Sequence, residues 1–208
     1  AAQTIGLQYT TASNAGFITG LCVVIVPLLV AWQQKKAPPR SITWGVICAT
    51  VGLALLSLGD KFTINYGDPI ILACALCFAV QIYLTGRFAP EVNATVLASF
   101  QILTVAVLSG ICSVLFPQPP LLFSAYAWFG VISTAVLCTS LAFLVQAKMQ
   151  QFTSSSHTAI IFAAEPVFAA VFAYFFAAEV LSIRGYLGAA LVLAGILIAE
   201  LSSIKEKA

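Results

Sequence analysis

Long apolar runs separated by short polar breaks dominate the chain. A membrane-spanning helix needs about 20 apolar residues, whereas the strands of a membrane β-barrel are about half as long and alternate in polarity. The runs here are long and do not alternate, so the pattern predicts an all-α membrane protein, a polytopic bundle of seven transmembrane helices. The predicted spans are Thr11–Trp32, Ile42–Leu58, Pro69–Phe88, Asn93–Phe116, Leu121–Ala147, Ser155–Ala178 and Ile183–Ser202.

The breaks between these runs are short and rich in residues that end or begin helices. Pro69 suits the first turn of the third helix, and serines of the stretch Ser154–Ser156 can cap the sixth. Prolines also follow the first, third and fourth runs. Connections this short force neighbouring helices to run antiparallel. The pattern leaves no room for a water-soluble domain or a long linker.

Composition agrees with lipid as the main solvent. Of the 208 residues, 61% are hydrophobic and only 8% are charged, and the mean hydropathy is +1.04. A soluble domain carries about a quarter charged residues. The net charge of +2 is too small to indicate a nucleic-acid partner.

The positive charges are distributed unevenly between the two ends of the predicted helices. If the ends are assigned alternately to two faces, seven of the nine basic residues collect on one face. These seven are Lys35, Lys36, Arg40, Arg87, Lys148, Lys205 and Lys207, and only Lys61 and Arg184 fall on the other face. Basic loops stay in the cytoplasm, so the C-terminus is expected there. With seven spans Ala1 then lies outside, and we expect an odd number of further spans before it.

The first two and the last two predicted helices share a pattern. Each pair has a Thr/Ser-rich start, an internal proline and two glycines seven residues apart, Gly45 and Gly52 in one pair and Gly188 and Gly195 in the other. The first copy starts outside and the second starts inside. This arrangement indicates an inverted-topology repeat, which is typical of secondary transporters.

Several of these segments resemble a known family. The stretch Gly6–Phe17 followed by Val26–Leu29 is similar to the fourth helix of the EamA family, in the drug/metabolite transporter superfamily. The stretch Ala164–Ala169, then Glu179 and the stretch Gly188–Gly195, resembles the ninth and tenth helices.

The resemblance implies ten helices in two inverted repeats of five, with this chain matching helices four to ten. Residues 1–59 would then end the first repeat and residues 68–204 would form the second. The family walls its cavity partly with helices one and three. The implied function is alternating-access transport, as an exporter of small organic metabolites, amino acids or drugs in the cell (inner or plasma) membrane. A non-transporting fragment or scaffold, a membrane enzyme and a receptor stay open as alternatives.

Glu165 is the strongest candidate for a functional residue. It lies about ten residues into the sixth predicted helix, at roughly 15 Å depth. A carboxylate at that depth needs a cavity or a partner, and Pro166 after it cannot donate a backbone hydrogen bond, which favours a helix break. The residue is therefore predicted to be a substrate or proton site, with a protonated packing residue as the alternative. Thr158 shares its helix face at helical spacing.

Other polar side chains within the spans are weaker candidates. Gln81 lies mid-span in the third helix, on a polar stripe that either lines a cavity or binds a neighbouring helix. Asn14 and Thr19 on the first helix and Gln101 on the fourth are further candidates for the substrate cavity. Like Glu165, His157 is a candidate proton relay. It is the only histidine of the chain, and a hydrated polar residue at the membrane interface is the simpler interpretation.

No pattern indicates catalysis or a cofactor. The Cys74/Cys77 pair lies inside an apolar run without further metal ligands, so no metal site is expected. The spans contain no paired aspartates, no zinc-protease signature and no phosphate-binding loop. The expected partners are a small-molecule substrate and the lipid bilayer, and self-association into a homo-oligomer is left open.

Overall fold

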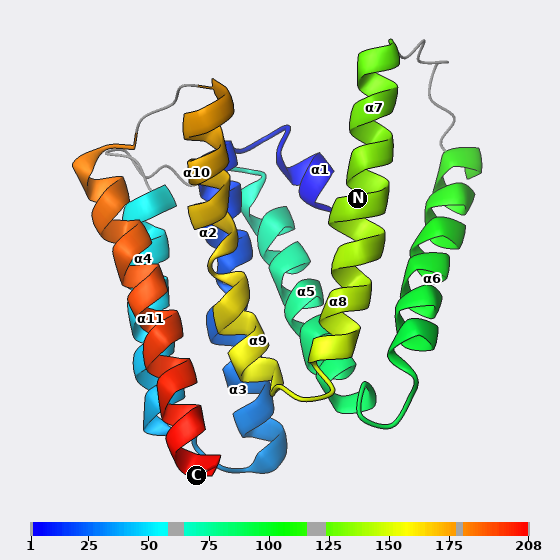
Figure 1. The fold of residues 1–208 in the computed structure, drawn as a ribbon. Coiled ribbons are helices and arrows are strands. Elements are labelled where there is room, and N and C mark those ends of the chain that lie inside the picture. The colour runs from blue at the N-terminus through cyan, green and yellow to red at the C-terminus, as the bar shows by residue number, and fades with distance from the viewer. Residues whose placement is uncertain (1, 58–64, 116–123, 178–180, 208) are drawn as a thin grey trace. The chain divides into compact units, whose positions relative to one another are not determined.

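The computed structural model describes residues 2–57, 65–115, 124–177 and 181–207, and these residues form helices joined by turns (Figure 1). Within them, seven helical stretches are long and apolar enough to cross a membrane. The predicted all-α polytopic fold is thereby confirmed. Lys61 and Glu179 lie outside the described residues.

Three predicted spans are divided in the structure. The elements are α1 (Ala2–Gly6), α2 (Ala12–Gly20), α3 (Cys22–Gln34), α4 (Arg40–Ser57), α5 (Asp68–Phe88), α6 (Ala94–Leu115), α7 (Ala125–Ser133), the π-helix η1 (Thr134–Leu141), α8 (Ala142–Met149), α9 (Ser155–Phe162), α10 (Glu165–Ala177) and α11 (Ile183–Lys207). The first span is thus α2 with α3, the fifth is α7, η1 and α8, and the sixth is α9 with α10.

The chain forms two compact units. Unit 1 comprises Ala1–Leu84 and Ser154–Ala208, and unit 2 comprises Thr85–Thr153. These units cut across the two expected repeats, whose boundaries at residues 59 and 68 stay a prediction.

The closest helix pair of unit 1 is α4 against α11, which lie side by side in Figure 1. A β-carbon built on Gly52 would lie 2.6 Å from the carbonyl oxygen of Gly188, and one built on Gly45 would lie 2.9 Å from that of Gly195. The four glycines noticed in the sequence therefore face each other in pairs. Because the earlier glycine of α4 meets the later glycine of α11, the two helices run antiparallel.

The core of unit 1 is built around this pair. Ile160 of α9 and Ala199 of α11 both reach the position beside Gly45, and Val23 of α3 and Leu53 of α4 are buried in the same cluster. A second cluster joins α3, α5 and α9, with buried Cys22, Val26, Ala79, Ile82 and Ala159. Helix α9 therefore packs against α3 on one side and against α4 and α11 on the other.

The start of α5 is fixed by a capping carboxylate. Asp68 is buried and accepts hydrogen bonds from the Thr10 hydroxyl and, at 2.9 Å, from the backbone N–H of Asn65. An acidic residue in the first turn satisfies free N–H groups and complements the helix dipole. This contact ties the segment between α1 and α2 to the start of α5.

Unit 2 contains the long helix α6 and the divided span α7–η1–α8. Buried Ala94 and Ala98 of α6 pack against Ala147 of α8. In η1 the hydroxyls of Thr139 and Ser140 donate to carbonyls five residues earlier, at 3.1 and 2.9 Å. The sequence predicted a uniform α-helix here, and it gave no sign of these wide turns.

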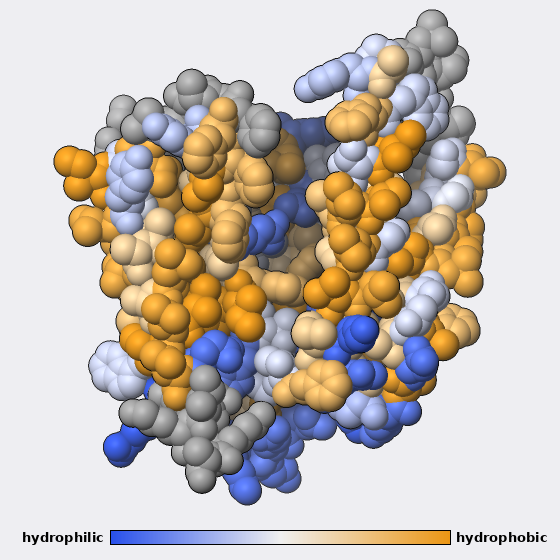
Figure 2. All heavy atoms as spheres, in the orientation of Figure 1, coloured by the Kyte–Doolittle hydropathy of each residue, from blue (hydrophilic) through white to orange (hydrophobic). Residues whose placement is uncertain are grey.

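The outer faces of both units are apolar, as a lipid environment requires. Figure 2 shows hydrophobic side chains over the visible faces of α10 and α11 and, in the other unit, of α8. Large exposed hydrophobic side chains include Phe129 and Leu137 in unit 2 and Phe172 and Leu197 in unit 1.

Candidate functional site

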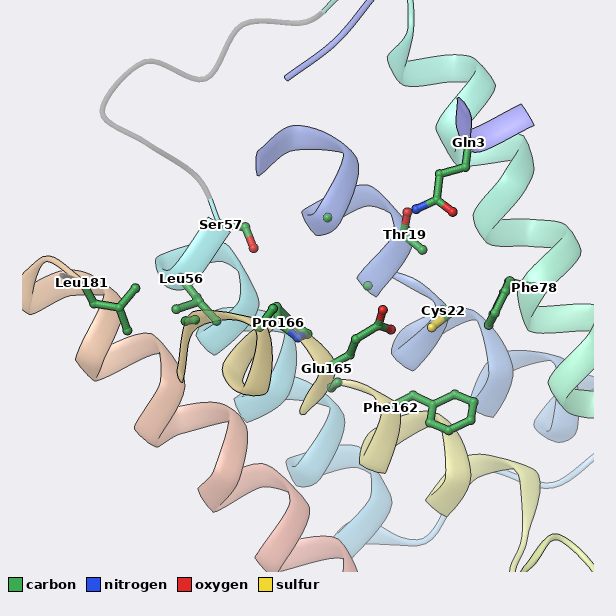
Figure 3. A pocket seen from close by; sticks show the side chains of 15 residues that line it. Gln3, Thr19, Cys22, Leu56, Ser57, Phe78, Phe162, Glu165, Pro166 and Leu181 are labelled. Atoms are coloured by element: carbon green, nitrogen blue, oxygen red, sulfur yellow. The ribbon is translucent and has the colours of Figure 1, made fainter. Parts of the chain in front are cut away.

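Unit 1 contains a cavity of about 520 Å³, which is within the usual size range of small-molecule sites (Figure 3). Its walls come from helices α1 to α5, from α9 and α10, and from Leu181, which precedes α11. The lining residues are Gln3, Gly16, Thr19, Gly20, Cys22, Leu56, Ser57, Phe78, Phe162, Ala163, Glu165, Pro166, Ala169, Ala170 and Leu181.

Two interrupted helices meet at this cavity. The first span is interrupted at Leu21, where the backbone N–H bonds to the Ile18 carbonyl at 3.1 Å, three residues back. The residues on either side of it, Gly20 and Cys22, both line the cavity. This interruption was not predicted, because no proline or polar residue marks it.

The second interruption separates α9 from α10. Ala163 and Ala164 bond to carbonyls three residues back, at 3.1 and 3.0 Å, instead of continuing the α-helical pattern. Such a tightened turn inside a helix often marks a functional hinge. Pro166 carries no N–H with which to bond to the Phe162 carbonyl one turn earlier, so the helix break expected beside Glu165 has a local cause.

Glu165 is the first residue of α10 and extends its carboxyl group into the cavity. Figure 3 shows this group pointing towards the space between Thr19, Cys22 and Phe162. Its side chain is exposed, and within the described residues it forms no ion pair. The N-terminus of a helix favours a negative charge, so this position stabilises a carboxylate that faces water in the cavity.

The uncharged polar side chains of the wall are those of Gln3, Thr19 and Ser57. Thr19 donates its hydroxyl hydrogen to the Ala15 carbonyl at 2.8 Å, which leaves the oxygen lone pairs available to a ligand. Figure 3 shows the Gln3 amide pointing towards Thr19. Ser57 lies at the end of α4, near Leu56.

The remaining walls are aromatic, aliphatic or very small. Phe78 of α5 and Phe162 of α9 flank Cys22 in Figure 3. A β-carbon built on Gly16 would have no atom within 4 Å, so its missing side chain keeps this part of the cavity open.

The other predicted cavity residues of unit 1 lie elsewhere. Thr158 is buried and donates its hydroxyl to the Ser154 carbonyl at 3.2 Å. Asn14 is buried on α2, where its backbone N–H donates to Thr11 Oγ1 at 3.1 Å. Gln81 is half-buried on α5. None of the three is among the lining residues.

Gln101 and His157 each have a local structural partner. In unit 2, Gln101 Nε2 donates to Thr85 Oγ1 at 2.9 Å and so joins α6 to α5. His157 lies at the start of α9, with Nδ1 2.8 Å from the hydroxyl of the capping residue Ser154. Its Nε2 is buried without a hydrogen-bond partner among the described residues.

Sequence reasoning missed most of the cavity wall. Cys22, Phe78 and Gly16 were not among the predicted cavity residues, since an apolar or small side chain carries no sign of which helix face meets a cavity. Gln3 lies in α1, a short segment before the first predicted span. Within the described residues, no group of three or more His, Cys, Asp or Glu side chains could hold a metal ion.

The seven apolar spans define a polytopic helical membrane protein. Two of these spans are interrupted at a cavity that contains a carboxylate, which is an arrangement typical of secondary transporters. The chain belongs to the EamA-like transporter family, whose sequence model matches residues 65–201. The resemblance seen in the sequence is thereby confirmed.

Two relatives from Archaeoglobus fulgidus are each described as an uncharacterized transporter. One is 35% identical over 199 residues and the other 23% identical over 210 residues. The alignments cover 96% and 93% of this chain, and 64% and 68% of the relatives. The chain therefore spans about two thirds of the length of each. A crystal structure with 20% identity has the same fold, with a TM-score of 0.84 over 100% of this chain and 73% of its own.

Proposed function

We propose that the protein transports small organic molecules across the membrane by alternating access, with the cavity of unit 1 as the binding site. The observation that carries this proposal is the meeting of two interrupted spans, α2–α3 and α9–α10, at one cavity. In secondary transporters, interrupted helices expose backbone groups to substrate near the middle of the membrane. Membership of a transporter family supports the same activity.

Glu165 is the proposed substrate or proton site, and Thr19 the proposed second polar contact. Both line the cavity, from the two interrupted spans. Thr158, Asn14, Gln81 and Gln101 stay predictions of the sequence, with hydrogen-bonding or packing roles in the structure. His157 stays a predicted proton relay, and it lies in the first turn of α9.

The proposed orientation places the C-terminus in the cytoplasm of the cell. It rests on the seven basic residues that collect at one end of the spans. The proposed direction is export, as the resemblance noted in the sequence implied.

The test is transport by the full-length protein in proteoliposomes. Uptake or release of a panel of labelled organic amines, amino acids and neutral metabolites would be measured with and without a proton gradient. At least one compound should move faster than in empty vesicles. If no compound crosses under any gradient, the transport proposal is wrong.

A pair of matched variants then tests the site. Glu165→Gln removes the cavity carboxylate, and transport should fall at least about tenfold because a charge-assisted contact is lost. Glu200→Gln makes the same change in the C-terminal half of α11, at a residue that is not among the described lining residues, and should retain transport. Equal transport by both variants would exclude the cavity as the site.

A further inference from the structure

Two polar side chains of the cavity, Glu165 and Thr19, present acceptors to a ligand, whereas Gln3 and Ser57 can donate as well as accept. A carboxylate such as Glu165 accepts hydrogen bonds and cannot donate them. The Thr19 hydrogen is already committed to the Ala15 carbonyl, so its oxygen faces a ligand as an acceptor. A ligand that satisfies these groups must bring donors.

The charge of the cavity points to the same chemistry. Among the lining residues that the structure describes, Glu165 is the only acidic one, and none is a lysine, arginine or histidine. Within the described part of the chain no cation pairs with this carboxylate. The carboxylate therefore offers a cationic ligand a charge-assisted hydrogen bond for which no described lining residue competes.

The rest of the wall selects the body of the ligand. Phe78 and Phe162 supply aromatic surface on either side of Cys22, and Leu56 and Leu181 supply aliphatic surface beyond Pro166 (Figure 3). An ammonium group beside an aromatic ring gains cation–π attraction, and an apolar group is favoured by removal from water.

We infer that the cavity binds an organic primary ammonium compound that carries an apolar group. The ammonium places its N–H donors on Glu165 and Thr19, and the apolar group lies against Phe78 and Phe162. This inference rests on the proposed transport function and names the substrate class of the same cavity.

Four ligands of one shape separate the contributions of charge and hydrogen bonding. Benzylamine carries an ammonium with three donors, and benzyltrimethylammonium carries the charge without donors. Benzyl alcohol is neutral, and benzoate is an anion. Binding to the purified full-length protein at pH 7 would be measured by isothermal titration calorimetry in detergent.

The wild-type protein should bind benzylamine about 10- to 100-fold more tightly than benzyl alcohol, as expected for one charge-assisted pair. Benzyltrimethylammonium should lie between the two, and benzoate should bind most weakly. In Glu165→Gln the preference for benzylamine over benzyl alcohol should disappear, while benzyl alcohol binds as before. Retained binding of benzyl alcohol shows that the variant is folded.

A threonine pair tests the hydrogen-bond contribution separately. Thr19→Val should reduce the preference for benzylamine over benzyltrimethylammonium severalfold. Thr50→Val is the control, because Thr50 makes the same type of bond, to the Val46 carbonyl at 2.7 Å, on α4 outside the cavity wall. This control should leave the preference unchanged.

Equal binding of all four ligands, or strongest binding of benzoate, would overturn the inference. So would a preference for benzylamine that survives in Glu165→Gln. If proteoliposomes still transport a neutral or anionic compound through the Glu165-dependent site, the transport proposal stands and only the substrate class is wrong. If nothing is transported but benzylamine binds as described, the binding class stands and the transport proposal fails.

Discussion

The glycine pairs between α4 and α11 allow a quantitative test of the packing of unit 1. In Gly52→Ala the added β-carbon would lie 2.6 Å from the Gly188 carbonyl oxygen and 2.7 Å from the Val192 backbone nitrogen. Both distances are well inside the roughly 3.5 Å at which carbon contacts become attractive. Because the obstructing atoms belong to backbone, a change of side-chain rotamer cannot relieve the overlap, and the two helices must separate.

Two opposing contributions set the magnitude. Overpacking by one methyl group costs about 1–3 kcal/mol. Replacing glycine by alanine inside a helix gains about 1 kcal/mol. Gly110→Ala on α6 gives the second contribution alone, because a β-carbon there has no atom within 4 Å. The free energy of unfolding should therefore be about 1–3 kcal/mol lower for Gly52→Ala than for Gly110→Ala.

Thermal unfolding in detergent would measure this difference. For a chain of this length, 1 kcal/mol corresponds to roughly 2–4 °C in Tm. Gly52→Ala should melt clearly below Gly110→Ala, and Gly188→Ala should behave like Gly52→Ala because its β-carbon would lie 2.6 Å from the Gly52 carbonyl oxygen. If Gly52→Ala and Gly110→Ala melt together, the close α4–α11 contact does not exist in the protein.

Three other substitutions have distinct expected outcomes. Gly16→Leu places a side chain in open cavity space, so transport into proteoliposomes should fall at least about tenfold while Tm stays within a few degrees. A large drop in Tm would mean that Gly16 packs against protein instead. Pro166→Ala restores an N–H to the carbonyl one turn earlier, so the variant should melt higher but transport more slowly; faster transport would contradict a functional role for the break. Thr85→Val removes the acceptor of Gln101, so the free energy of unfolding should fall by about 0.6–1.7 kcal/mol in urea or thermal melts. No loss would show that this bond contributes nothing to unit 2.

The spans could be predicted because their length and composition follow directly from the thickness of the bilayer. The α9–α10 break could be anticipated at Glu165 and Pro166, because a charge deep in an apolar span and a proline inside a helix each carry a physical cost that needs an explanation. Thr158 was predicted to share the helix face of Glu165, on the assumption that one continuous helix contains both residues. The tightened turn at Ala163 and Ala164 changes the direction of the helix between them, and that assumption no longer applies.

The break at Leu21 and most of the cavity wall could not be predicted. Leu21 is an ordinary helix-forming residue, and its single bond to a carbonyl three residues back leaves no trace in the sequence. Whether Phe78 faces a cavity, another helix or lipid depends on tertiary packing, because all three surroundings accept an apolar side chain. The sequence therefore predicts polar site residues better than the surfaces that surround them.

The equal spacing of the two glycine pairs connects packing with the proposed mechanism. Seven residues span about 10.5 Å of helix, so two antiparallel helices with the same spacing can meet at two points. Gly45 with Gly195 and Gly52 with Gly188 make these two contacts, which prevent α4 and α11 from rotating against each other. The interrupted spans α2–α3 and α9–α10 pack against this pair. If the proposed alternating access takes place, we expect the α4–α11 pair to stay rigid and the changes in backbone angles to occur at Leu21 and at Ala163–Ala164, next to Glu165.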